Sequence, residues 1–380
     1  MTKISRTTDM TQGSEMRHII MFSLPLLAGN LLQQTYNIVD TMVVGRYLGD
    51  DALAAVGATG SITYLFYTLC IGLSVGAGII VAQYFGAGKK KALRSAVFNS
   101  ALVTAIFGIV ISLLSVPAAK PILELLKVPD KLIGDSVAYM QIACGGTIAV
   151  AAYNWINAIM RALGDSKTPL IFLGAASLLN ALLDLLFVVV FKFGIAGAAW
   201  ATVLTQALSA ISCIVYCFAV SGEIKLTADD LHADKDMMCR CVKTGVPIAI
   251  QNGLISVSMV ALQRVTNGFG ETVMAAYTVS MRIEQFVQQP FSSLNAAVST
   301  FTGQNIGAGK EKRAQKGLAC AIKISVIFSA VVLVLFTLFG GAITSWFVKG
   351  KTVISISAKA LIITLSLIHI SEPTRLGMIS

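Results

Sequence analysis

Asp40 and Asp184 are acidic residues inside segments that are apolar enough to cross a membrane. Asp40 lies in the run 19–47, and Asp184 lies in the run 168–191. A carboxylate at membrane depth costs about 2.5 to 3.5 kcal/mol on insertion scales, so it is retained where it faces a cavity or a partner. Both carboxyl groups are therefore candidates for binding a cation or a proton.

Neighbouring polar side chains could complete such a site. Asn180 lies one helical turn before Asp184 on the same face, and Thr202 offers a hydroxyl group in the next apolar run. These oxygen atoms are the hard ligands that Na⁺ accepts, and two adjacent carboxylates also bind a proton because each disfavours ionisation of the other. The alternative is that each residue only bonds a neighbouring helix. We predict a proton or Na⁺ site at Asp40, Asn180, Asp184 and Thr202, and no other metal site.

Further polar residues in the apolar runs are candidates for lining a cavity. At 3.6 residues per turn, those of the first run fall near the stripe that carries Asp40. Glu284 could instead pair with Arg282. The residues that we expect at the cavity are Gln33, Tyr36, Asn37, Tyr153, Asn154 and Glu284. Pro25 cannot donate a backbone hydrogen bond, so we expect it to be a hinge in the first helix.

Composition excludes an ordinary soluble protein. Of 380 residues, 56% are apolar and only 13% are charged, and the mean hydropathy is +0.77. The chain is therefore predicted to be a polytopic membrane protein. Its net charge of +10 comes from short basic clusters between apolar runs, so we expect no nucleic-acid partner.

The seven cysteines and three histidines do not form a metal-binding or catalytic pattern. The cysteines are scattered through apolar runs without zinc-ligand spacing, and no histidine accompanies a nucleophile motif. We therefore expect neither an enzyme nor a cofactor.

Ten apolar runs are long enough to be membrane helices at about 20 residues per crossing. They are 19–45, 54–83, 96–119, 136–161, 168–191, 195–220, 243–267, 273–303, 317–347 and 352–366. With the N-terminus in the cytoplasm, 18 basic residues lie on the cytoplasmic side and 8 on the other side. The excess predicts this orientation, because basic residues concentrate in cytoplasmic loops.

The chain repeats itself at an offset of about 221 residues. The segment AQYFGAGKKKALRSA (82–96) returns as GQNIGAGKEKRAQKG (303–317), and Pro25 returns as Pro247. Six helices per repeat is an even number, so both copies have the same orientation in the membrane. We predict an all-α fold of two parallel six-helix repeats: an N-terminal lobe at 1–220, a cytoplasmic linker at 221–242 and an incomplete C-terminal lobe at 243–364.

The repeat also predicts where the second lobe should close. Its end is expected near residue 441, which implies that helices eleven and twelve are missing from these 380 residues. The closing stretch LSLIHISEPTR resembles a translated sequencing adapter. We expect residues 365–380 to be a library artefact.

Several motifs together resemble the multidrug and toxic compound extrusion (MATE) family of cation-coupled antiporters. They are LPLLAGNLLQQTYNIVDTMVVGRYLGDDALAAVG, QYFGAGK, QNIGAGK, RALGDSKTP and GIAGAAWAT. The resemblance implies twelve helices in a V-shaped pair of lobes. It also implies export of cationic or amphipathic drugs in exchange for Na⁺ or H⁺.

In this family the cation site matches Asp40, Asn180, Asp184 and Thr202, and the bending proline matches Pro25. The expected setting is a bacterial inner membrane, with the protein acting as a monomer. One alternative is a flippase for lipid-linked oligosaccharides from the same broad superfamily, which would be expected to have an arginine-rich cavity. An intramembrane enzyme would need a histidine or a Ser/Lys dyad at matching depth, and none is visible.

Overall fold

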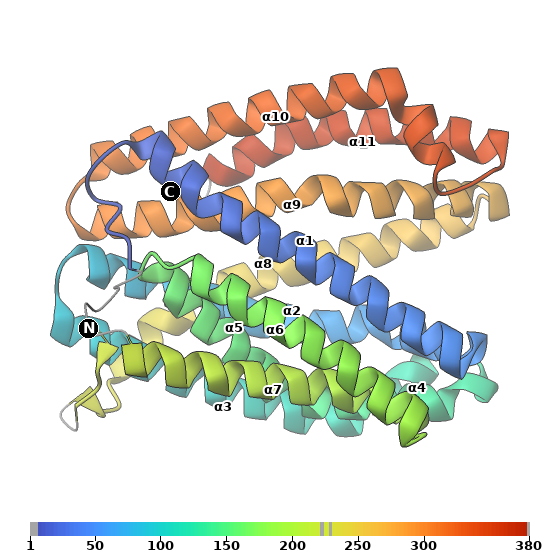
Figure 1. Cartoon of the computed structure of the whole chain (residues 1–380), viewed down its shortest axis with the longest axis horizontal. Coiled ribbons are helices and arrows are strands. Elements are labelled where there is room, and N and C mark those ends of the chain that lie inside the picture. The colour runs from blue at the N-terminus through green and yellow to red at the C-terminus, as the bar shows by residue number, and fades with distance from the viewer. Residues whose placement is uncertain (1–6, 221–223, 228–229, 378–380) are drawn as a thin grey trace. The chain divides into compact units, whose positions relative to one another are not determined.

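The computed structural model describes residues 7–220, 224–227 and 230–377, although not the side chains of 260, 267, 271 and 367–377. These residues form eleven α-helices and one π-helical segment, and no strand occurs among them (Figure 1). The helices are α1 Glu15–Leu48, α2 Asp50–Gly86, α3 Lys90–Leu125, α4 Asp130–Gly145, α5 Thr147–Ala162, α6 Lys167–Asp184, η1 Leu185–Val190, α7 Gly194–Val220, α8 Lys235–Asn267, α9 Glu271–Gly307, α10 Glu311–Ser345 and α11 Lys351–Gly377. The predicted all-α fold is confirmed.

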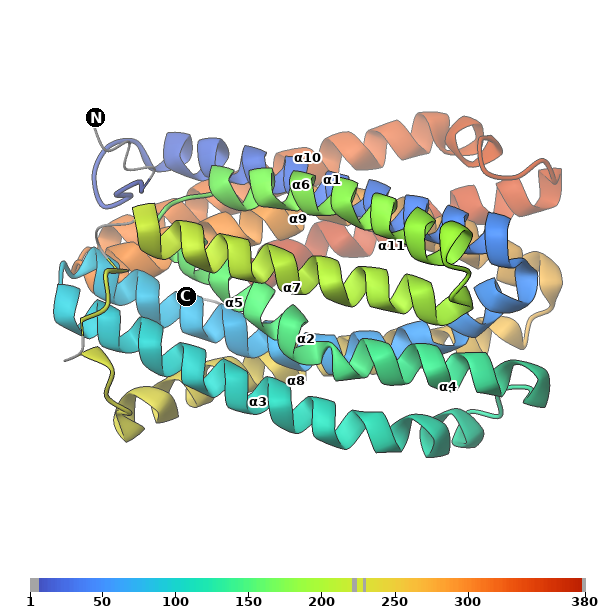
Figure 2. The same ribbon diagram turned by 60° about the horizontal axis from the view of Figure 1, so that its bottom comes forward.

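One helix that was predicted to be continuous is broken in the structure. The run 136–161 is not a single helix but the pair α4 and α5, which meet at an angle of 43° (Figure 2). The break falls at Gly146, where the side chain of Val203 from α7 occupies the space that a Cβ atom would need. A side chain at 146 would therefore clash, and the glycine lets α7 approach the bend.

The run 168–191 also changes its geometry along its length. It is α-helical as α6 up to Asp184 and then continues as the π-helical turn η1. A π-helical turn inside an α-helix is uncommon and frequently marks a functional site. Here it starts directly after the acidic residue singled out above.

Within the described residues, six helices are long and apolar enough to cross a membrane, and the bent pair α4 and α5 makes a seventh. Helices α1 and α9 fall outside this group although each is longer than 30 residues. The reason for α1 is its polar content, because Asn30, Gln33, Gln34, Asn37 and Asp40 lower its average hydropathy. Helix α1 therefore differs from the uniformly apolar helices of the bundle in carrying several polar groups along its length.

The chain divides into two compact units. Unit 1 comprises Met1–Asp9 and Leu32–Ser256, and unit 2 comprises Met10–Leu31 and Val257–Ser380. Helices α1 and α8 each contribute one part to each unit. The lobes 1–220 and 243–364 are defined by the sequence repeat and stay a prediction.

Unit 1 has an apolar core between α2, α3, α5 and α7. Trp155 and Ile159 of α5 are buried there with Val81 and Val97. The indole Nε1 of Trp155 donates a hydrogen bond to Ser100 Oγ of α3 at 2.9 Å. This bond fixes the rotation of α5 and so determines which face of α5 is left for the site described below.

The segment that precedes α8 is held against α3 in unit 1. Asn99 donates to the carbonyl of His232 at 3.1 Å and accepts from the backbone N–H of Asp234 at 2.8 Å. The backbone N–H and hydroxyl of Thr227, with Arg94 nearby, hold the pKa of Asp230 below its ordinary value. Helix α8 starts at Lys235, inside the stretch expected as linker. Residues 221–223 and 228–229 of that linker lie outside the described residues.

In unit 2, the repeated motif QNIGAGK and the nearby Arg313 bind the segment that leads into α1. Gln304 accepts a hydrogen bond from the backbone N–H of Met10, and Asn305 donates to the Met10 carbonyl at 3.2 Å. Arg313 donates to the Met10 and Gln12 carbonyls. The motif therefore satisfies the backbone of residues that precede α1.

The crossing of α2 and α8 in unit 1 depends on small residues. A Cβ atom at Gly76 would lie 2.5 Å from the Cα of Gly245, and one at Gly72 would clash with the backbone of Ala249. Glycine and alanine at such crossings let two helix backbones approach closely in a membrane protein.

We expect Gly76→Ala to destabilise the protein by about 1 to 3 kcal/mol, because the added methyl group meets backbone that cannot rotate away. Gly60→Ala on the same helix has open space around it and serves as the control. Thermal unfolding can be followed with a thiol-reactive dye, since Cys70, Cys144, Cys213, Cys217 and Cys241 are buried. Equal melting temperatures for the two variants would contradict the close crossing.

Candidate functional site

Asp40 of α1 and Asp184 of α6 lie together inside unit 1. Asp184 is 0% exposed and Asp40 is half-buried. Their carboxyl groups are within hydrogen-bonding reach of each other. Among the described residues, no donor reaches Asp40 Oδ1 or either carboxyl oxygen of Asp184. The two acids therefore face each other without a basic partner.

The two other predicted ligands lie nearby. Asn180 is 1% exposed, one turn before Asp184, and neither its amide nitrogen nor its amide oxygen has a partner among the described residues. The hydroxyl of Thr202 on α7 is within reach of the hydroxyl of Tyr36, which itself lies near both acids. The structure thus brings these four residues into one region of unit 1.

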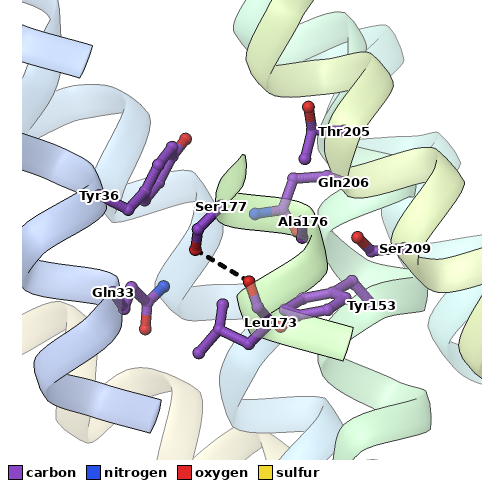
Figure 3. Close-up of a pocket in the computed structure, with 9 residues that line it drawn as sticks. All are labelled: Gln33, Tyr36, Tyr153, Leu173, Ala176, Ser177, Thr205, Gln206 and Ser209. Atoms are coloured by element: carbon purple, nitrogen blue, oxygen red, sulfur yellow. Dashed lines mark hydrogen bonds between the residues drawn. The ribbon is translucent and has the colours of Figure 1, made fainter. Parts of the chain in front are cut away.

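A small polar pocket continues from Tyr36 into unit 1. Figure 3 shows residues of α1, α5, α6 and α7 lining it. The lining residues are Gln33, Tyr36, Tyr153, Leu173, Ala176, Ser177, Thr205, Gln206 and Ser209. The space has room for about one water molecule. Thr205 Oγ1 and Gln206 Oε1 have no hydrogen-bond partner among the described residues. The wall therefore offers uncharged polar groups to whatever enters.

Sequence reasoning missed two tyrosines near the acids. Tyr139 of α4 lies close to Asp40, Asp184, Tyr36 and Tyr67. Tyr67 of α2 donates a hydrogen bond to the carbonyl of Ala143 at 3.1 Å. Each is a polar tip on an aromatic ring within an apolar run, and that signal could have found both. Their hydroxyl groups make the surroundings of the acids more polar than the predicted four residues alone.

Other predicted residues lie elsewhere. Asn37 is exposed and does not line the pocket, and Asn154 donates its amide to the Val150 carbonyl at 2.8 Å. Glu284 belongs to unit 2, where it accepts a hydrogen bond from Gln288 at 3.0 Å. Pro25 also belongs to unit 2, and α1 runs through it as a continuous helix. Of the six cavity candidates, Gln33, Tyr36 and Tyr153 line the pocket.

This arrangement suits a small cation or a proton. Buried oxygen atoms without donors are costly unless a positive charge or a proton satisfies them. The described residues contain no cluster of three or more histidine, cysteine or acidic side chains of the kind that holds a transition metal. The donors are carboxyl, amide and hydroxyl oxygens, which suit a hard monovalent ion.

Membrane-length helices that enclose an acidic pair and a small pocket, as those of unit 1 do, are typical of a membrane transport protein. The MatE family model matches the chain twice, at residues 25–186 and 247–372, and the two matches begin at the prolines paired by the repeat. The chain therefore belongs to the MatE family, that of the MATE transporters, and the resemblance seen in the sequence is confirmed.

Curated relatives agree with this assignment. The probable multidrug resistance protein YpnP of Bacillus subtilis is 31% identical over 80% of this chain and 68% of its own length. YoeA of the same organism, also a probable multidrug resistance protein, is 31% identical over 94% of this chain and 79% of its own length. The probable multidrug resistance protein NorM of Thermotoga maritima is 23% identical over 90% of this chain and 74% of its own length.

Solved structures share the fold. A MOP superfamily transporter from Pyrococcus furiosus superposes with a TM-score of 0.87 at 23% identity, covering 96% of this chain and 82% of that chain. The outward-facing structure of a multidrug resistance MATE family transporter superposes with a TM-score of 0.88 at 23% identity, and it too covers 96% of this chain and 82% of that chain.

We expect Asp184→Asn to stabilise the protein by about 1 to 3 kcal/mol, because the amide removes a buried charge and can donate a hydrogen bond to Asp40. The measurement is the melting temperature of the purified protein. Asp135→Asn replaces an exposed acid on α4 and should change stability by less than about 0.5 kcal/mol. A lower melting temperature for Asp184→Asn would show that the carboxyl group has a stabilising partner instead.

Proposed function

We propose that this protein exports cationic or amphipathic drugs in exchange for Na⁺ or H⁺ that enters through the acidic pair. The observation that carries the proposal is the pairing of Asp40 and Asp184 beside the unpartnered amide of Asn180. Family membership and the names of the relatives support drug export.

The coupling follows from competition for the same negative charge. A cation that moves inward through the membrane potential gains about 2.3 kcal/mol per 100 mV. When it binds at Asp40 and Asp184, with Asn180 and Thr202 as further ligands, it neutralises the charge that would hold a cationic drug. Binding can drive export only if the ion prefers one conformation, and Pro25 is the hinge that we propose for α1.

The setting that we propose is a bacterial cytoplasmic membrane, with the N-terminus in the cytoplasm and the protein acting as a monomer. The basic residues between the apolar runs support this orientation. The lobes 1–220 and 243–364 would be the two bodies that move. Glu284, Asn37 and Asn154 stay candidates for contacts with the drug in other conformations.

In bacteria that lack their own drug exporters, Asp40→Asn in the full-length protein should abolish ethidium efflux, because an uncharged amide can neither exchange a proton nor hold a cation strongly. Efflux is measured as the loss of cellular ethidium fluorescence. The matched control is Asp50→Asn, which changes an exposed acid at the start of α2. Undiminished efflux by Asp40→Asn would refute the proposed role.

Competition predicts a second result with the purified protein. Raising the concentration of the coupling ion should weaken ethidium binding, because ion and drug seek the same carboxyl groups. Titrations of ethidium fluorescence at several Na⁺ concentrations, and separately at several pH values, identify which ion acts. Binding that responds to neither ion would contradict coupling at this site.

A further inference from the structure

The buried face of α6 continues across Asp184 into η1. Its buried residues Ala176, Asn180, Asp184 and Val188 recur at every fourth position. A regular α-helix has about 3.6 residues per turn, so each step of four residues turns about 40° past the previous one. Three such steps in a regular helix would carry Val188 about 120° around the axis from Ala176. A face with this spacing stays on one side only where the helix is locally unwound.

The π-helical turn provides this unwinding. Its i→i+5 hydrogen bonds enclose more residues than an α-helical turn, so the chain winds less per residue. The backbone N–H of Phe191 donates such a bond to the carbonyl of Leu186 at 2.9 Å. Because η1 follows Asp184 directly, the wider turn falls in the step from Asp184 to Val188. Both side chains therefore stay on the buried side of the helix.

Val188 anchors η1 in an apolar cluster of unit 1. It is 4% exposed, and the same cluster buries Val44 of α1 and Ile195 of α7. Tyr139, which lies close to both acids, packs against this cluster as well. The cluster thus fixes the rotation of η1 about its own axis, one turn beyond Asp184.

Helix α7 and the loop before it hold η1 in its wider form. The backbone N–H of Phe193 donates to the carbonyl of Phe187 at 2.9 Å, and Lys192 is left-handed with φ +54°. A Cβ atom at Gly197 would lie 3.1 Å from the backbone carbonyl of Phe187, so the glycine lets α7 pack directly against η1. A π-helical turn is uncommon and a left-handed lysine is unfavourable, so surrounding contacts have to maintain both.

We propose that η1 positions the carboxyl group of Asp184 for ion binding, and that Gly197 is the residue of α7 that holds η1 in place. This inference rests on the proposed function, in which Asp184 binds the coupling ion. If η1 wound as a regular α-helix while Val188 kept its place in the cluster, Asp184 would turn about the helix axis away from Asp40. The ion would then lose a ligand, although the rest of the bundle would stay packed.

The test removes one residue from the π-helical turn. Val190 is 64% exposed, so its deletion takes away no buried side chain and lets the remaining residues wind as a regular α-helix. Ethidium binding by the purified full-length protein is titrated with Na⁺ and, separately, with acid. We expect the deletion to raise the ion concentration that halves ethidium binding about 10-fold, because a charge-assisted ligand is lost. Ethidium affinity at low Na⁺ and high pH should change much less, since a large organic cation does not require such close ligand geometry.

Two substitutions separate positioning from folding. Val190→Ala shortens the same side chain and keeps the number of residues, so it should keep the native ion response. Gly197→Ala also keeps the number of residues but pushes on the backbone of Phe187, so we expect a smaller shift in the direction of the deletion. This variant decides the outcome if the deletion variant does not fold. A merely structural role of η1 would instead lower the melting temperature and leave the ion response at its native value.

The inference is overturned if the folded deletion variant or Gly197→Ala keeps the native ion response. It is also overturned if Val190→Ala shifts that response as much as the deletion, or if the deletion weakens ethidium and ion binding equally. Failure of the proposed function is a different result, because ethidium binding by the native protein would then respond to neither Na⁺ nor acid.

Discussion

The structure depends on the cost of keeping two acids inside an apolar bundle. Asp184 is fully buried beside Asp40, and neither has a basic partner among the described side chains. In a medium of low dielectric constant, two such charges cannot both persist without a proton or a cation. We therefore propose that the bundle is most stable in a form that has bound a positive charge, so that its stability depends on ion binding.

The elements around the acids have the geometry that this constraint requires. The π-helical turn starts at Leu185, directly after Asp184, and the bend at Gly146 separates α4 from α5. As a result, Tyr139 of α4 lies near the acids while Tyr153 of α5 lines the pocket. A straight helix over 136–161 would keep both on one axis. The departures from regular helix geometry thus occur where polar side chains have to converge.

The candidate site could be predicted in part because burial of charge leaves a strong signal in a sequence. Asp40, Asn180 and Asp184 stood out as polar residues in apolar runs, and the structure places them together. Tyr139 and Tyr67 carry a weaker signal, since a tyrosine in a membrane helix often only bonds a neighbour. The same ambiguity applies to two predicted cavity residues that do not line this pocket. Asn37 and Asn154 have suitable chemistry, but one is exposed and the other bonds its own helix.

The sequence alone determined that this is a polytopic membrane protein, and it showed the ten apolar runs, the acidic residues within them and the internal repeat, because hydropathy and matching segments can be read along the chain without knowing how it folds. The tertiary structure decided which residues of different runs meet. Small residues set how closely α2 and α8 cross, Val203 fills the space at Gly146, and the Trp155 hydrogen bond fixes the rotation of α5. These contacts join positions more than fifty residues apart, and packing between helices rather than local pattern selects them. For that reason the sequence could point to Asp40, whereas the pocket between Tyr36 and Tyr153 emerged only from the fold.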